Sequence, residues 1–212
     1  MSQPGAHDFP VVGSELVHRG AILALRVDEV RMPGGRVARR EVVEKHGAVA
    51  VVALDDQDRV LLLHQYRHPV GRRLWELPAG LLDVAGEAPA VTAARELAEE
   101  AGLAARRWSV LVDVASSPGF TDEAVRVFLA QGLSTVVRGA GADDEEADLT
   151  SAWVPLAEAV ARVLSGEIAN CTAVAGLLGL AAVHSTGVEP RRADAEWVDR
   201  PERLVARGPL RG

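Results

Sequence analysis

The chain has 212 residues, 48% of them hydrophobic, with 23 basic and 30 acidic residues for a net charge of -7. This size supports one sizeable core, and the acidic balance argues against nucleic acid as a partner. A single cysteine, Cys171, excludes an internal disulfide, and its apolar surroundings favour a place in the core. Since the N-terminal residues lack a signal peptide and no apolar run is long enough to span a bilayer, we expect a cytoplasmic protein without a membrane partner.

The chain order places strands first, one helix among them, and helices last. Alternating or continuous apolar patterns predict strands at residues 21–32, 36–44, 47–56, 59–67, 108–115, 124–130 and 151–156. Helix-favouring stretches lie at residues 89–101, 156–165 and 170–184. The turn at 33–35, Pro-Gly-Gly, joins the first two strands as a hairpin. Together these elements predict an α/β fold of the α+β type, with a mixed sheet in a sandwich.

Composition divides the chain into four expected regions. A flexible leader covers 1–12, and a small N-terminal antiparallel β-subdomain covers 13–46. The main domain extends over 47–186. A tail at 187–212 mixes Pro, Arg, Asp and Glu, and we expect it to be peripheral or partly disordered.

The helix expected at 89–101 gathers negative charge on one face. Glu96, Glu99 and Glu100 share a side at 3.6 residues per turn, where like charges repel. Only Arg95 offers an opposite charge nearby. A solvated acidic face is the ordinary explanation, but hard oxygen ligands also suit Mg²⁺, which completes its coordination with water and substrate phosphates. The cluster therefore points towards phosphate chemistry.

Residues 80–103 resemble the Nudix box, Gly-x5-Glu-x7-Arg-Glu-U-x-Glu-Glu-x-Gly-U, in which U is aliphatic. The positions that match in type and spacing are Glu87, Arg95, Glu96, Leu97, Glu99, Glu100, Gly102 and Leu103. One departure is that six residues, not five, separate Gly80 from Glu87. A loop insertion costs little, so the helical register stays intact while the path of the loop and the role of Gly80 are left open. The resemblance implies a Nudix hydrolase domain over 47–186, built as an α/β/α sandwich.

The resemblance also implies roles for the matching positions. Divalent cations, Mg²⁺ or alternatively Mn²⁺ or another metal, would be held by the Ala79 carbonyl and the carboxylates of Glu96, Glu99 and Glu100. Glu96 and Glu100 would be the main ligands, Glu100 being essential for catalysis, and Glu99 would bind partly or through water. Glu87 and Arg95 would orient these ligands without binding the metal themselves.

Both flanks of the box resemble ADP-ribose pyrophosphatases of the actinobacterial type. Residues 72–83 resemble the segment before the box, and Pro118 lies fifteen residues after Leu103, as a proline does in that subgroup. A Pro-Gly turn is common in any protein, so Pro118 alone is weak evidence. The resemblance extends over most of residues 15–200 and implies hydrolysis of ADP-ribose to AMP and ribose 5-phosphate.

Further candidates for the substrate site lie outside the box. Guanidinium groups suit a diphosphate and stack on adenine, and the resemblance implies substrate contacts for Arg40 and Arg67. Glu41 and Glu123 are weaker candidates for substrate binding. In the resembling enzymes a glutamate on a later loop acts as general base, which corresponds here to Glu146, with Glu145 as the alternative. Two surface arginines and an exposed acidic loop are the simpler explanations.

The sequence leaves two rival functions open, and the resemblance also implies an oligomeric state. The preferred substrate could be another nucleoside diphosphate sugar, or the domain could be a nucleotide-sensing module without catalysis. A sensor would show a degraded box or a DNA-binding extension, and neither is seen here. The resemblance implies a homodimer that exchanges N-terminal strands and builds each site from both chains. The histidines show no metal-binding pair, and no Walker loop or Gly-x-Ser-x-Gly elbow is present.

Overall fold

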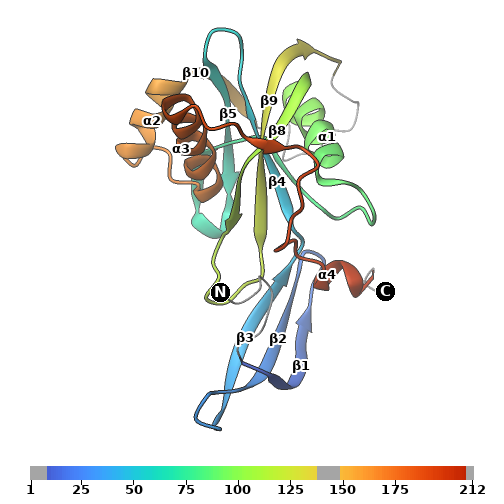
Figure 1. The fold of residues 1–212 in the computed structure, drawn as a ribbon. Helices are drawn as coiled ribbons and strands as arrows, with labels where there is room; N and C mark the ends of the chain where they lie inside the picture. Colours follow the sequence, from blue (N-terminus) through green and yellow to red (C-terminus); the bar gives the residue numbers. More distant parts are fainter. Residues whose placement is uncertain (1–8, 138–148, 209–212) are drawn as a thin grey trace.

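The computed structural model describes residues 9–137 and 149–208. Its body contains a five-stranded sheet in the order β11-β8-β9-β4-β7, and a separate three-stranded sheet projects from one end of it (Figure 1). The strands of the central sheet are Arg191–Arg192 (β11), Leu103–Ala115 (β8), Ala124–Thr135 (β9), Ala48–Ala53 (β4) and Ala79–Leu81 (β7). A smaller sheet in the body has the order β10-β5-β6, formed by Thr150–Pro155, Arg59–Arg67 and Arg72–Glu76.

Helices cover both faces of the central sheet. The helices are Pro89–Ala101 (α1), Leu156–Leu164 (α2), Cys171–Thr186 (α3) and Arg203–Ala206 (α4), with a short 3-10 turn at His68–Val70. Figure 1 shows α1 on one side of the sheet and α2 with α3 on the other. The expected α/β/α sandwich with a mixed sheet is confirmed, since β4 is parallel to β9 while β8 is antiparallel to it.

The position of β4 between two helix layers explains why its sequence is apolar throughout, without the alternation of a half-exposed strand. Ala50 and Val52 belong to the cluster that includes α3, whereas Val49 and Val51 belong to the cluster that includes α1. Because each face of β4 packs against a helix layer, the residues that point to either face are buried. The strand is thereby fixed at the centre of the body, next to β7 and α1.

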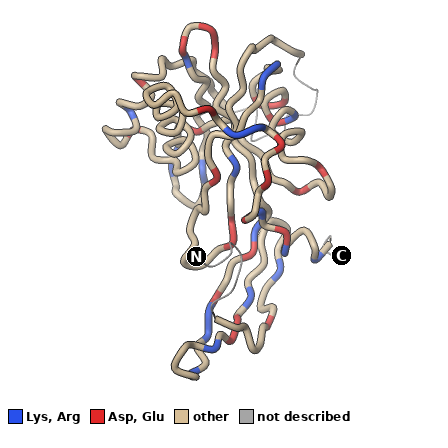
Figure 2. The backbone as a smooth tube through the Cα atoms, in the orientation of Figure 1, with Lys and Arg blue, Asp and Glu red and all other residues tan. Residues whose placement is uncertain are grey.

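The projecting sheet has three antiparallel strands, β1 (Val11–Arg19), β2 (Leu23–Arg31) and β3 (Val37–Lys45). The expected hairpin is confirmed, because Arg31 pairs with Val37 across the turn at 33–35. Sequence analysis did not identify β1, whose pattern of polar and apolar residues has no clear alternation and which is almost entirely exposed. Basic and acidic residues are interspersed along this sheet and over the body (Figure 2).

The expectation of a partly disordered tail is wrong for residues 187–208. This segment forms β11 against β8, crosses the body and ends in α4 beside the N-terminal sheet (Figure 1). Pro201 and Leu204 are buried, and Trp197 packs against the core cluster of α1. Three well-spaced apolar anchors order the segment although its composition is polar and charged.

Helix α3 is the apolar helix expected near 170–184. Asn170 accepts a hydrogen bond from the Ala173 amide, 2.9 Å long, and caps the N-terminus. Its buried residues include Leu177 and Leu180. Cys171, expected in the core, is exposed instead, because it is the first residue of the helix and lies before the buried positions. Among the described residues, no helix has the length and apolar character needed to cross a membrane.

Candidate active site

Helix α1 turns Glu96 and Glu100 towards β7, where both are partly buried, and leaves Glu99 exposed. Thr92, Ala93 and Leu97 are buried, and the helix begins with Pro89, whose fixed backbone suits a first turn. It ends at Gly102, which has a φ of 64°. The predicted bounds of this helix are confirmed. The positions of Glu96, Glu99 and Glu100 are therefore set by a short, well-delimited helix.

Arg95 compensates the negative charge of the acidic face. Its guanidinium lies 2.8 Å from Glu96, 2.9 Å from Glu99 and 3.4 Å from Glu87. Although burial works against the charged form, the carboxylates of Glu96 and Glu99 raise the pKa of Arg95. Thr92 donates a 2.7 Å hydrogen bond to Glu87, and this bond lowers the pKa of Glu87. Glu87 and Arg95 thus form an ordered pair beside the candidate ligands.

Strand β7 lies directly against the acidic face. The Ala79 amide donates a 2.9 Å hydrogen bond to Glu100. At Gly80 an added Cβ would lie 2.1 Å from the Glu96 carboxylate, so glycine leaves the room that this side chain occupies against the strand. This contact accounts for a glycine at the position whose role the sequence had left open.

The donor set at this face fits a divalent cation. Burial raises the pKa of Glu96, and the nearby carboxylate of Glu99 also raises it, whereas Arg95 lowers it. Carboxylate and carbonyl oxygens are the ligands that hard divalent cations prefer. Within the described part of the chain, no three His, Cys, Asp or Glu side chains are arranged as a metal site. Instead, Arg95 donates hydrogen bonds to Glu96 and Glu99, and Glu100 accepts one from the Ala79 amide.

Arg40 and Glu41 lie far along the chain from α1 but close to the Pro118 turn. Both residues are on β3 and line a cavity of about 510 Å³ together with Pro118 and Phe120. The loop and the strand are joined by backbone hydrogen bonds, including one of 2.7 Å from the Val43 amide to the Phe120 carbonyl. The structure therefore brings two substrate candidates and the subgroup's proline to one surface.

Arg67 and Glu123 each have a charged partner that sequence analysis missed. Arg67, at the end of β5, pairs with Glu76 on β6, with 2.7 Å between the guanidinium and the carboxylate. Glu76 is buried. Its position within the otherwise apolar residues 74–78 was the sequence signal that this glutamate has a charged partner. Burial would raise the pKa of Glu123, but bonds from Lys45 (2.6 Å) and Ser116 (2.6 Å) outweigh it and lower the pKa.

The remaining candidates cannot be placed. Glu145 and Glu146, proposed as alternatives for the general base, lie outside the described residues. In the described part of the chain, the candidates form four groups: the acidic face with Ala79, the β3 surface, the Arg67–Glu76 pair, and Glu123 with its partner Lys45. The first two groups lie on different parts of the molecule, since α1 packs on the body and β3 belongs to the projecting sheet (Figure 1).

Comparison with known proteins agrees with the fold and the box. Residues 44–172 match the NUDIX domain, and residues 10–43 match the nucleoside diphosphate sugar hydrolase N-terminal domain. The chain is 59% identical over 201 residues to the ADP-ribose pyrophosphatase of Mycobacterium tuberculosis, covering 95% of this chain and 97% of that protein. It is 40% identical over 135 residues to the methanol dehydrogenase activator of Bacillus methanolicus, covering 64% and 72%. The crystal structure of an ADP compounds hydrolase has a similar fold, with a TM-score of 0.73 at 21% identity over 85% of this chain and 97% of that chain.

Proposed function

This chain belongs to the Nudix family, and we propose that it is a divalent-metal-dependent hydrolase that cleaves ADP-ribose into AMP and ribose 5-phosphate. The observation that carries the substrate assignment is the 59% identity to an ADP-ribose pyrophosphatase over nearly the full length of both chains. The acidic face of α1 and the β7 contact supply the chemistry that such a reaction needs.

In the reaction, the oxygen of a water molecule forms a bond to one phosphorus of the diphosphate. The bond from that phosphorus to the bridging oxygen breaks, and the bridging oxygen leaves on the other phosphate. Bound Mg²⁺ would neutralise the charge of the diphosphate and of the leaving phosphate. Its ligands would be the Ala79 carbonyl and the carboxylates of Glu96, Glu99 and Glu100.

The protein side chains have separate tasks in this scheme. Glu87 and Arg95 hold the carboxylates of α1 in place, as their contacts of 2.7 to 3.4 Å support. Glu146 takes a proton from the attacking water, which is a role that a carboxylate on a loop performs once substrate has bound. Arg40 and Arg67 bind the diphosphate or the adenine through their guanidinium groups.

We further propose that the active unit is a homodimer. Arg40 lies on the projecting sheet, away from the acidic face of its own chain, so a second copy is needed to bring the two together. The sheet also exposes apolar side chains, including Val11, Leu16, Val17 and Val37, which a partner would cover. Each site would then combine α1 of one chain with β3 of the other.

Hydrolysis of a panel of nucleoside diphosphate derivatives with Mg²⁺ tests the proposed activity. ADP-ribose should give the highest kcat/KM, and Glu100→Gln should lower kcat by on the order of 10²–10³-fold, because several kcal/mol of charge stabilisation is lost. If another nucleoside diphosphate sugar gave the highest kcat/KM, the substrate assignment would change to that compound. This is the nearest rival assignment, because residues 10–43 match the nucleoside diphosphate sugar hydrolase N-terminal domain. Binding of ADP-ribose without turnover of any compound would instead favour a sensing module.

A further inference from the structure

The C-terminal strap, defined as residues 188–208, lies outside the part of the chain that matches the NUDIX domain, which ends at residue 172. It leaves α3, adds β11 to the edge of the central sheet, passes the beginning of α1 and ends beside the N-terminal sheet (Figure 1). Nothing in the proposed chemistry uses this segment. Its contacts nevertheless show that it is docked at a specific place.

Arg126 on β9 anchors the strap from inside the body. This side chain is only 2% exposed and donates hydrogen bonds to the carbonyls of Ala195 (2.6 Å) and Glu196 (2.9 Å). Its charge is balanced by Asp113, 2.7 Å away, and its guanidinium lies 4.8 Å from the centre of the Trp197 ring. A buried arginine that is paired, hydrogen-bonded and stacked fixes the strap backbone at this point.

From this anchor the strap reaches the box loop, defined as residues 82–88 between β7 and α1. The Arg200 amide donates a 3.3 Å hydrogen bond to the Trp197 carbonyl, and Arg200 lines the same cavity as Arg126 and Trp197. The Arg200 guanidinium then donates a 3.3 Å hydrogen bond to the Glu87 carbonyl. Residues 88–90, at the junction of the loop and α1, also line this cavity.

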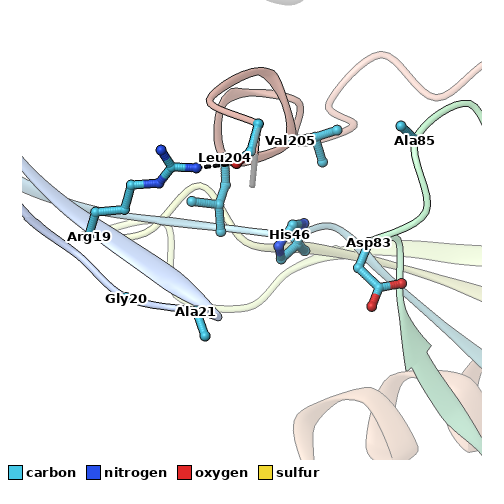
Figure 3. Close-up of a pocket in the computed structure, with 9 residues that line it drawn as sticks. Arg19, Gly20, Ala21, His46, Asp83, Ala85, Leu204 and Val205 are labelled. Atoms are coloured by element: carbon cyan, nitrogen blue, oxygen red, sulfur yellow. Dashed lines mark hydrogen bonds between the residues drawn. The ribbon is translucent and has the colours of Figure 1, made fainter. Parts of the chain in front are cut away.

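The C-terminal end of the strap, α4, lies opposite the beginning of the box loop. Figure 3 shows Leu204 and Val205 of α4 on one side of a cavity of about 380 Å³, with Asp83 and Ala85 of the box loop on its far side. The strap therefore bonds to the loop at Glu87 and faces Asp83 and Ala85 across this cavity. This is the loop that carries one residue more than the usual box spacing.

We propose that Arg200 is a positioning residue for the metal-binding face, acting through the backbone of Glu87. The connection passes from the Glu87 carbonyl to its carboxylate, which accepts from Thr92 (2.7 Å) and Arg95 (3.4 Å). Arg95 in turn holds Glu96 at 2.8 Å. An anchored carbonyl restricts the loop, so Glu87 and Arg95 keep the carboxylates of α1 in a binding arrangement. The effect of Arg200 on metal binding rests on the proposed function, whereas its effect on the loop does not.

The test compares Arg200→Ala and Arg200→Lys with Arg192→Ala as the matched control. Arg192 is also on the strap, but its side chain is exposed and pairs only with Asp194 among the contacts described. Two quantities are measured: amide hydrogen exchange of residues 83–88 without metal, and the Mg²⁺ concentration that gives half the maximal rate with ADP-ribose. The exchange experiment needs no activity.

Arg200→Ala should speed exchange in the loop and raise the half-saturating Mg²⁺ concentration, each by about three- to tenfold. This is less than the roughly 10–100-fold typical of a direct partner of a metal ligand, because Arg200 acts one contact further away. Arg200→Lys should restore part of both effects, and Arg192→Ala should match wild type. Unchanged exchange in Arg200→Ala, or equal changes in Arg192→Ala, would overturn the proposal. Faster exchange with an unchanged Mg²⁺ requirement would also overturn it, because the loop would then not act on the metal. If wild type does not cleave ADP-ribose, the proposed function fails, while the exchange result still decides the role of Arg200 in the loop.

Discussion

At the scale of single residues, Gly80 is the most tightly constrained position beside the acidic face. Replacing it by alanine would place a Cβ 2.1 Å from the Glu96 carboxylate, so the Glu96 side chain must leave its position. We expect Gly80→Ala to lower activity or apparent Mg²⁺ affinity by about 10–100-fold, because the ligands lose their arrangement. Steady-state kinetics at varied Mg²⁺ measures this. The control is Gly34→Ala, where nothing lies within 4 Å of the new Cβ; equal kinetics for the two variants would contradict the expectation.

Glu146 carries the proposed proton transfer. Glu146→Gln should lower kcat by on the order of 10²–10⁴-fold, the usual contribution of a positioned acid or base, with little change in the Mg²⁺ requirement. Glu145→Gln should behave like wild type. The measurement is kcat as a function of pH at saturating Mg²⁺. A large loss in Glu145→Gln with an active Glu146→Gln would reverse the assignment of the two neighbours.

At the scale of elements, the ion pairs of Asp113 join β8, β9 and the strap. Burial would raise the pKa of Asp113, but hydrogen bonds from Arg126 and Arg191 outweigh this and hold the pKa below its usual value. A carboxyl whose folded pKa is lowered stabilises the fold above its unfolded pKa, about 3.9 for aspartate, and this contribution is lost as pH falls through the folded value.

The expected result is that Asp113→Asn destabilises the protein most near neutral pH. The difference in unfolding free energy from wild type should shrink below about pH 4, where the unfolded-state pKa of aspartate lies. Urea unfolding between pH 7 and pH 3 measures it. Asp194→Asn on the same strap, an exposed pair with Arg192, should show no measurable difference at any pH. A difference for Asp113→Asn that is constant with pH would exclude this electrostatic account.

The same elements show what the sequence could and could not predict. Helix α1, with Pro89 at its start and Gly102 at its end, carried strong local signals, and so did the apolar strands β4 and β5. The strap carried none, because its order depends on Arg126, which is 69 residues before its partner Ala195. A charged residue within the apolar strand β9 indicates that a partner exists but not where it lies. The Arg67–Glu76 pair joins residues only nine apart on the neighbouring strands β5 and β6, and it was missed because no strand was predicted at residues 72–76.

At the scale of the whole molecule, the proposed homodimer would build each site from two chains. If each site combines β3 of one chain with α1 of the other, Arg40→Ala and Glu100→Gln chains, each weakly active alone, should complement each other. A co-expressed equal mixture should recover about a quarter of wild-type activity, since half of the dimers are mixed and each has one intact site. Co-expression of Arg40→Ala with the Arg40→Ala/Glu100→Gln double variant cannot rebuild a site and serves as control. Activity equal to the average of the separate variants would contradict a shared site.

The most direct test of the central claim is hydrolysis of ADP-ribose in ¹⁸O-labelled water, with Mg²⁺ and with the metal removed by chelation. The account predicts AMP and ribose 5-phosphate as products, with one labelled oxygen in the phosphate of one of them, and no products without the metal. Label on a ribose carbon, or equal turnover after chelation, would contradict metal-dependent attack of water on phosphorus.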